Sequence, residues 1–161
     1  MTTLFWFFII ISLVVFNYLF SNILDYINHS NWKDEIPNEL KDFYNKQKYK
    51  KAKDYALSKN KIGLFSSSIS FLFIMTLLVF NGYGFIDQLV NSDILKSFFL
   101  FDLNSSFAQS GLFFLILFIL NSIISIPFSY YNTFIIEEKF GFNKTTKSTF
   151  FLDILKSFFL S

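Results

Sequence analysis

Charged residues divide the chain into clusters that are separated by long uncharged stretches. Three segments contain no Asp, Glu, Lys or Arg: Met1 to Leu24, Ile62 to Ile86 and Leu103 to Ile136. Each is longer than the roughly 20 residues that a helix needs to cross about 30 Å of hydrocarbon. Their most apolar parts predict membrane-spanning helices over about residues 4–24, 63–83 and 108–129. The alternative, a soluble bundle of three core helices, would need other segments to cover each helix on all sides, and the polar remainder is too short for that.

The composition also favours a membrane protein. Of the 161 residues 53% are hydrophobic and only 16% charged, against about 25% charged residues in an average soluble domain. A soluble domain of this size has too little interior to bury 26 Phe side chains. The predicted fold class is therefore an all-α membrane protein with three transmembrane helices, a truncated fourth helix and a cytoplasmic amphipathic helix.

The fourth apolar stretch lies at residues 148–161 and is interrupted by Asp153 and Lys156. As a helix it would be about 20 Å long, which is too short to span the bilayer. It could lie in the interface as an amphipathic helix or be the first part of a transmembrane helix that is cut off, and the family resemblance given below favours truncation. The two charged residues are three apart, so they share a helix face and could pair or point into a polar interior.

The distribution of lysine predicts how the chain is oriented. Nine Lys lie between Asp25 and Lys61 and three between Glu137 and Lys147, against only Lys96 in the segment between the second and third spans. The positive-inside rule places both Lys-rich segments in the cytoplasm and the N-terminus outside. The first span is expected to remain as an anchor, because no basic residue precedes it and no small-x-small cleavage site follows it.

The Lys-rich segment after the first span predicts a basic amphipathic helix over about residues 37–60. Pro37 suits the first helical position, acidic residues lie close to it, and the lysines concentrate toward the other end, as the helix dipole favours. Apolar residues at a spacing of three to four form one face: Leu40, Phe43, Tyr44, Ala52, Tyr55 and Ala56. This face could lie on anionic headgroups or pack against the rest of a larger protein.

Residues that could carry catalytic chemistry are scarce. Cysteine is absent, which excludes disulfides and thiolate metal sites. All 14 basic residues are Lys and the net charge is +2, so nucleic acid is not a predicted partner. The only histidine, His29, directly follows the first span, where a solvated position is favoured over metal ligation, and no H-E-x-x-H motif is present. We therefore predict no catalytic residue, metal site or cofactor in this chain.

Two stretches of sequence carry a family resemblance. The first comprises Ile36-Pro37-x-x-Leu40, Lys48-Tyr49, Lys51-Ala52-x-x-Tyr55 and Lys59. The second, which is more specific, runs from Tyr131 to Thr146 around I-E-E-K-F-G-F-N-K and is followed by Phe151-x-Asp153-x-x-Lys156. Over nearly the whole chain, these stretches resemble the N-terminal portion of the type I CAAX prenyl proteases, a family of membrane zinc metalloproteases.

The resemblance implies an integral membrane protease whose helices surround a large water-filled chamber. In the family, zinc is held by the histidines of an H-E-x-x-H motif and a later Glu, all downstream of the D-x-x-K segment, so no zinc ligand or general base is assigned here. The chain alone is expected to be inactive. The implied partners are the lipid bilayer, the missing C-terminal catalytic portion on the same or a separate chain, and a protein or peptide substrate. The family-motif residues are Pro37, Leu40, Tyr55, Glu137, Glu138, Gly141, Phe142, Asn143, Asp153 and Lys156.

For the second motif a structural role is favoured over direct contact with substrate. Gly141 stands where a left-handed cap would end a helix, and Asn143, Thr145 or Thr146 could cap the next helix. If the fourth helix faces the chamber, Asp153 and Lys156 would belong to its polar lining.

Two other function classes remain open. The chain could be a stand-alone membrane scaffold or accessory subunit without enzymatic activity, or one half of a split protease. A composition without Arg and rich in Lys, Asn and Phe indicates an AT-rich genome, and we expect a bacterial inner-membrane protein. In that setting general proteolysis of membrane proteins is favoured over the cleavage of prenylated CAAX proteins.

Overall fold

The fold consists of long helices joined by short connections. The computed structural model describes residues 3–33, 35–38, 41–93, 95 and 105–160, and no strand occurs among them. The elements are α1 (Thr3–Ser30), α2 (Lys46–Val79), α3 (Gly82–Asn91), α5 (Ser106–Tyr131), η2 (Asn132–Glu137), α6 (Glu138–Phe140) and α7 (Lys147–Leu160). The predicted all-α class is confirmed.

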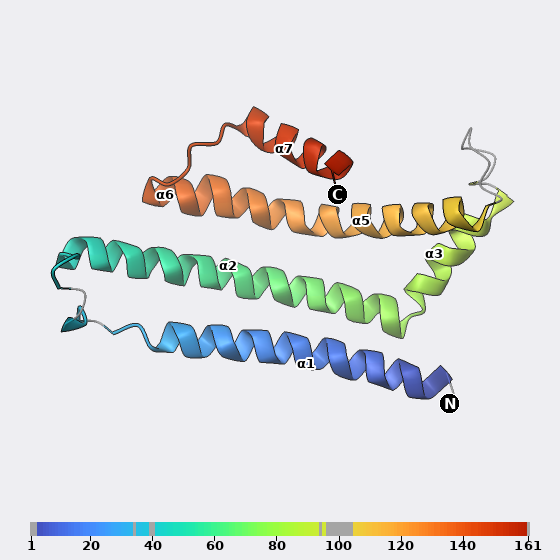
Figure 1. Cartoon of the computed structure of the whole chain (residues 1–161), viewed down its shortest axis with the longest axis horizontal. Coiled ribbons are helices and arrows are strands. Elements are labelled where there is room, and N and C mark those ends of the chain that lie inside the picture. Colours follow the sequence, from blue (N-terminus) through green and yellow to red (C-terminus); the bar gives the residue numbers. More distant parts are fainter. Residues whose placement is uncertain (1–2, 34, 39–40, 94, 96–104, 161) are drawn as a thin grey trace.

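The long helices lie side by side in the order of the sequence (Figure 1). α2 runs antiparallel to α1, and α5 runs antiparallel to α2, while the short α3 crosses the end of the molecule between α2 and α5. α7 turns back along the other side of α5. One small buried cluster consists of Ile86, Val90 and Leu112, where α3 packs against the start of α5. Other buried apolar side chains lie elsewhere: Tyr49, Ile136, Phe140 and Phe150.

In the part of the chain that the structure describes, three helices are long and apolar enough to cross a membrane: Thr3–Ser30, Lys46–Val79 and Ser106–Phe140. Large apolar side chains such as Phe8, Phe16 and Phe114 lie on their outer surfaces at more than 60% exposure. Hydrocarbon is the environment that accommodates such a surface, because an all-round apolar helix must be covered by protein or by lipid. The chain is an integral membrane protein, as the composition indicates.

The helix predicted over about residues 37–60 starts later than expected and is not a separate helix. The predicted start at Pro37 is wrong: α2 begins at Lys46, where the side chain of Asn45 accepts a hydrogen bond of 2.8 Å from the backbone N–H of Lys48. From there one helix of 34 residues continues without a break through the second apolar segment to Val79. At about 1.5 Å per residue it is roughly 50 Å long, so about 20 Å of it extends beyond the hydrocarbon.

The third long helix contains an irregular segment near its end. Pro127 lies inside α5, and the six residues of η2 form a π-helical turn between α5 and α6. A π-turn adds one residue to the helix, which rotates every following side chain by about 100° relative to a regular α-helix. Glu137, the last residue of η2, contacts Lys59 of α2.

Candidate functional site

The turn that ends α6 is formed by residues of the second motif. Gly141 has a left-handed backbone with a φ of 75°, and its N–H donates to the carbonyl of Glu138 at 3.0 Å. The N–H of Phe142 donates to the carbonyl of Glu137 at 2.8 Å. This pairing satisfies the last carbonyls of the helix, and glycine is favoured at the left-handed position because it has no Cβ. The predicted left-handed cap at Gly141 is confirmed.

Side-chain hydrogen bonds hold the loop after Gly141 and cap the start of α7. Asn143 Oδ1 accepts a 2.7 Å hydrogen bond from the backbone N–H of Thr145, while its Nδ2 donates to Glu138 Oε2 at 2.9 Å. Thr146 Oγ1 accepts from the N–H of Thr149 at 3.1 Å. Of the three proposed caps, Thr146 caps α7, and Asn143 ties the loop to α6.

The two sequence motifs meet in an aromatic cluster at this end of the molecule. The ring of Tyr55 on α2 lies 4.8 Å from the ring of Phe142 and 5.3 Å from that of Phe140, measured between centroids. Lys51 Nζ lies 5.6 Å from the centroid of Phe142. These geometries are those of favourable aromatic and cation–π contacts. The motifs are thus joined through contacts with each other.

An ion pair joins the same two segments one helical turn further along α2. Lys59 Nζ donates to Glu137 Oε1 at 3.1 Å, and Asn132 Nδ2 donates to the same oxygen at 3.2 Å. The two charged side chains are 41% and 26% exposed. Lys59 and Glu137 both belong to the motifs identified in the sequence, but their pairing was not predicted, and Asn132 was not singled out. The spacing of Lys59 four residues after Tyr55 places both on one helix face, and was the available signal.

The D-x-x-K pair lies on α7. Lys156 Nζ is 3.5 Å from Asp153 Oδ1, which confirms that the pair can form, and the side chains are 68% and 60% exposed. A groove of about 420 Å³ separates α7 from α5. Apolar side chains line it together with four hydroxyl groups: Ser122, Ser125, Ser129 and Ser157.

The predicted apolar face of the cytoplasmic segment is only partly formed. Leu40 lies outside the described residues, Pro37 lies in the irregular connection before α2, and Phe43 is 77% exposed. Tyr49, which the predicted face omits, is buried instead. Its hydroxyl donates to the carbonyl of Lys33 at 3.2 Å, so it fastens the connection to α2. The later start of α2 changes which residues pack, because the connection before it folds back onto the helix.

The described residues do not fit a zinc site. No three His, Asp or Glu side chains among them come together in a group that could hold a metal ion. His29 is half-buried at the end of α1 rather than solvated as expected, and its Nδ1 is buried without a hydrogen-bond partner in the described part of the chain.

Comparison with known proteins agrees with this arrangement. Residues 25–161 match the family model described as CAAX prenyl protease N-terminal, five membrane helices. The chain is 30% identical over 128 residues to a probable CAAX prenyl protease 1 of Schizosaccharomyces pombe, covering 77% of this chain and 27% of that protein. It is 29% identical over 161 residues to CAAX prenyl protease 1 of Saccharomyces cerevisiae, covering 97% and 35%. The crystal structure of S. mikatae Ste24p superposes with a TM-score of 0.80 at 27% identity, covering 96% of this chain and 36% of that one.

The fold and the matched residues together define an N-terminal domain of membrane helices. The chain belongs to the CAAX prenyl protease family. It spans 27% to 36% of the length of these three relatives. All three come from fungi, so they lend no support to the bacterial origin expected from composition.

Proposed function

We propose that this chain forms part of the chamber wall of a membrane zinc metalloendopeptidase. The zinc ligands and the general base are then supplied by polypeptide outside these 161 residues, on the same chain or on a separate one. The observation that carries the proposal is the junction of the two motifs, where Tyr55 and Lys59 of α2 contact Phe142 and Glu137.

The geometry of this junction supports a role in holding helices. The motif side chains are paired with one another, so their contacts fix how α2, η2 and the loop before α7 lie together. The hydroxyl groups along the α5–α7 groove and the exposed pair Asp153–Lys156 support a polar surface on this side. Polar groups at membrane depth are tolerated where they face protein or water, which is what a chamber wall provides.

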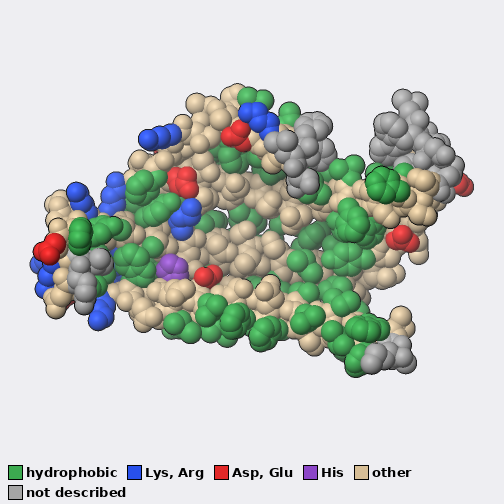
Figure 2. All heavy atoms as spheres, viewed as in Figure 1, with side chains coloured by type: hydrophobic (Ala, Val, Ile, Leu, Met, Phe, Trp, Pro, Cys, Tyr) green, Lys and Arg blue, Asp and Glu red, His purple; other side chains and the backbone are tan. Residues whose placement is uncertain are grey.

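The proposed topology places the N-terminus outside and both Lys-rich segments in the cytoplasm. Figure 2 shows Lys side chains gathered at the end of the molecule where α1 ends and α2 begins. The names of the relatives favour prenylated CAAX proteins as the substrate class. General membrane proteolysis was favoured only on the assumption of a bacterial source.

The coding sequence that follows codon 161 tests the proposal directly. An in-frame H-E-x-x-H motif would mean that the chamber and the zinc site share one chain, and a separate adjacent frame with that motif would mean a split enzyme. If neither exists, the proposal fails and the chain is a stand-alone scaffold. A second test co-expresses this chain with the part of the S. cerevisiae relative that follows the matched region. Chelator-sensitive cleavage of a prenylated CAAX peptide should require both polypeptides.

A further inference from the structure

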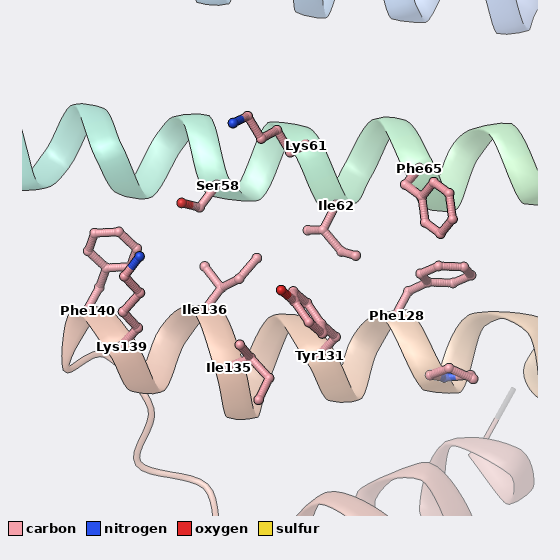
Figure 3. A pocket seen from close by; sticks show the side chains of 11 residues that line it. Ser58, Lys61, Ile62, Phe65, Phe128, Tyr131, Ile135, Ile136, Lys139 and Phe140 are labelled. Atoms are coloured by element: carbon pink, nitrogen blue, oxygen red, sulfur yellow. The ribbon is translucent and has the colours of Figure 1, made fainter.

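A groove of about 580 Å³ runs between α2 and the continuous helix formed by α5, η2 and α6 (Figure 3). It is apolar at one end, where Phe65 and Phe128 face each other across the gap, and Ile62 extends this surface. Lys139 lies at the other end with its ammonium directed toward α2, whereas Lys61 borders the groove on α2 with its ammonium directed away from α5 (Figure 3). No acidic side chain is among the described residues that line the groove. It therefore combines an apolar channel with a cationic mouth.

The two lysines stand where the hydrocarbon of the bilayer should end. Lys61 directly precedes the uncharged stretch Ile62 to Ile86, and Lys139 follows Leu103 to Ile136 after two acidic residues. Lipid phosphates occupy this level of a bilayer, just outside the acyl chains. The apolar end of the groove lies along residues inside the spans, at the level of the acyl chains.

The positive charge at the mouth of the groove is available. Lys59 is already paired with Glu137, whereas Lys61 and Lys139 have no ion-pair partner among the described residues. Because Lys59 pairs with Glu137 and the helices are antiparallel, Lys61 and Lys139 stand about 6 Å apart along the helix axes. Lysine side chains are long and flexible, so both ammonium groups can reach one phosphate between them.

We propose that this groove binds an anionic phospholipid. The phosphate lies between Lys61 and Lys139, and an acyl chain follows Ile62, Phe65 and Phe128. Two lysines without carboxylate partners favour a lipid with a net negative charge over a zwitterionic lipid, because the latter brings its own cation. The assignment to the cytoplasmic leaflet rests on the topology proposed above, but binding itself does not depend on it.

Native mass spectrometry of the 161-residue chain in nonionic detergent tests the proposal. Phosphatidylserine and phosphatidylcholine with identical acyl chains are added separately, and the lipid-bound fraction is measured. Phosphatidylserine should be retained more strongly, and Lys61→Gln with Lys139→Gln should lower its affinity by about fivefold for each lysine removed. The control Lys46→Gln with Lys48→Gln removes the same charge from exposed positions of α2 outside the groove, and should leave the preference unchanged.

A second measurement locates the acyl chain. In a Phe65→Trp variant, fluorescence should be quenched more by phosphatidylserine with brominated acyl chains than by brominated phosphatidylcholine, after subtraction of the signal from Trp6 and Trp32. Equal quenching by both lipids, equal retention of both lipids, or an equal loss in the control variant would overturn the proposal. A dimer without bound lipid would assign the groove to a second copy of the chain and would also overturn it. None of these results bears on the zinc site, so the proposed protease function is tested separately.

Discussion

The ammonium of Lys59 lies 3.1 Å from Oε1 of Glu137, although 78 residues of sequence separate them. The contact joins the Lys-rich part of the second long helix to the π-turn of the third. Asn132, which lies in the π-turn, donates to the same carboxylate oxygen. Glu137 Oε1 therefore accepts hydrogen bonds from both α2 and the π-turn. In this structure, Glu137 of the second motif serves to pack one helix against another.

Removal of this ion pair should destabilise the domain modestly. We expect Glu137→Gln and Lys59→Gln each to lower the free energy of unfolding by about 1 kcal/mol, because both side chains retain partial contact with water. Unfolding in mixed detergent micelles by SDS measures this. The double variant should cost less than the sum of the single variants. Strict additivity would show that the two charges do not interact in solution.

Substitution of Gly141 should cost stability through the backbone rather than through a clash. Gly141→Ala places a Cβ at a φ of 75°, where it would meet only Lys51 Nζ, at 4.0 Å, and should destabilise by about 1 kcal/mol. Gly141→Asn should cost less, since Asn tolerates this conformation better. Gly63→Ala is the matched control: it lies inside α2 with open space around it and should be neutral or stabilising. The same unfolding assay checks all three, and an equal loss for Gly63→Ala would contradict the backbone explanation.

The topology can be measured by labelling single cysteines in a chain that has none of its own. Asn91 and Lys144 are both exposed and lie at opposite ends of the helices. With a membrane-impermeant thiol reagent applied to intact cells, Asn91→Cys should be labelled and Lys144→Cys should be protected until the membrane is opened. The reverse pattern would invert the proposed orientation.

The isolated chain should neither bind zinc nor cleave peptides. Its described residues bring no three candidate ligands together, and His29 is its only histidine. Metal analysis after dialysis should find zinc well below one atom per chain, with the same result for His29→Ala. Stoichiometric zinc that depends on His29 would reveal a site that the described contacts do not show.

The fourth helix should remain at the cytoplasmic surface when the rest of the enzyme is absent. Asp153 and Lys156 would each cost about 2.5 to 3.5 kcal/mol at the bilayer centre. Ser157→Cys should therefore react from the cytoplasmic side. Replacing both charges, with Asp153→Leu and Lys156→Leu, should reduce that reactivity by favouring insertion. Labelling of Ser157→Cys from the outside in the unsubstituted background would show that the segment inserts unaided.

The sequence predicts a structural feature correctly where a single local rule determines it. Uncharged length predicts the three long helices, a single glycine predicts the turn at Gly141, and spacing predicts the Asp153–Lys156 pair. The predicted helix start is wrong where two local rules compete. Pro37 and its acidic neighbours satisfy the rules for a helix start, but Asn45 caps the helix that forms. The π-turn has no local signal. The spacing of Tyr55 and Lys59 gives only the helix face that they share, and the partner Glu137 depends on how α2 and η2 pack.

The unbroken course of α2 has a mechanical consequence. No turn separates its Lys-rich beginning from its apolar end, so the helix acts as a single stiff rod that is about 50 Å long. A displacement of its Lys-rich tip, where Tyr49 fastens the preceding connection, must tilt the whole rod. The opposite tip at Val79 would then swing in the other direction. Binding events at one membrane surface can thus shift the position of residues at the other without any local unfolding.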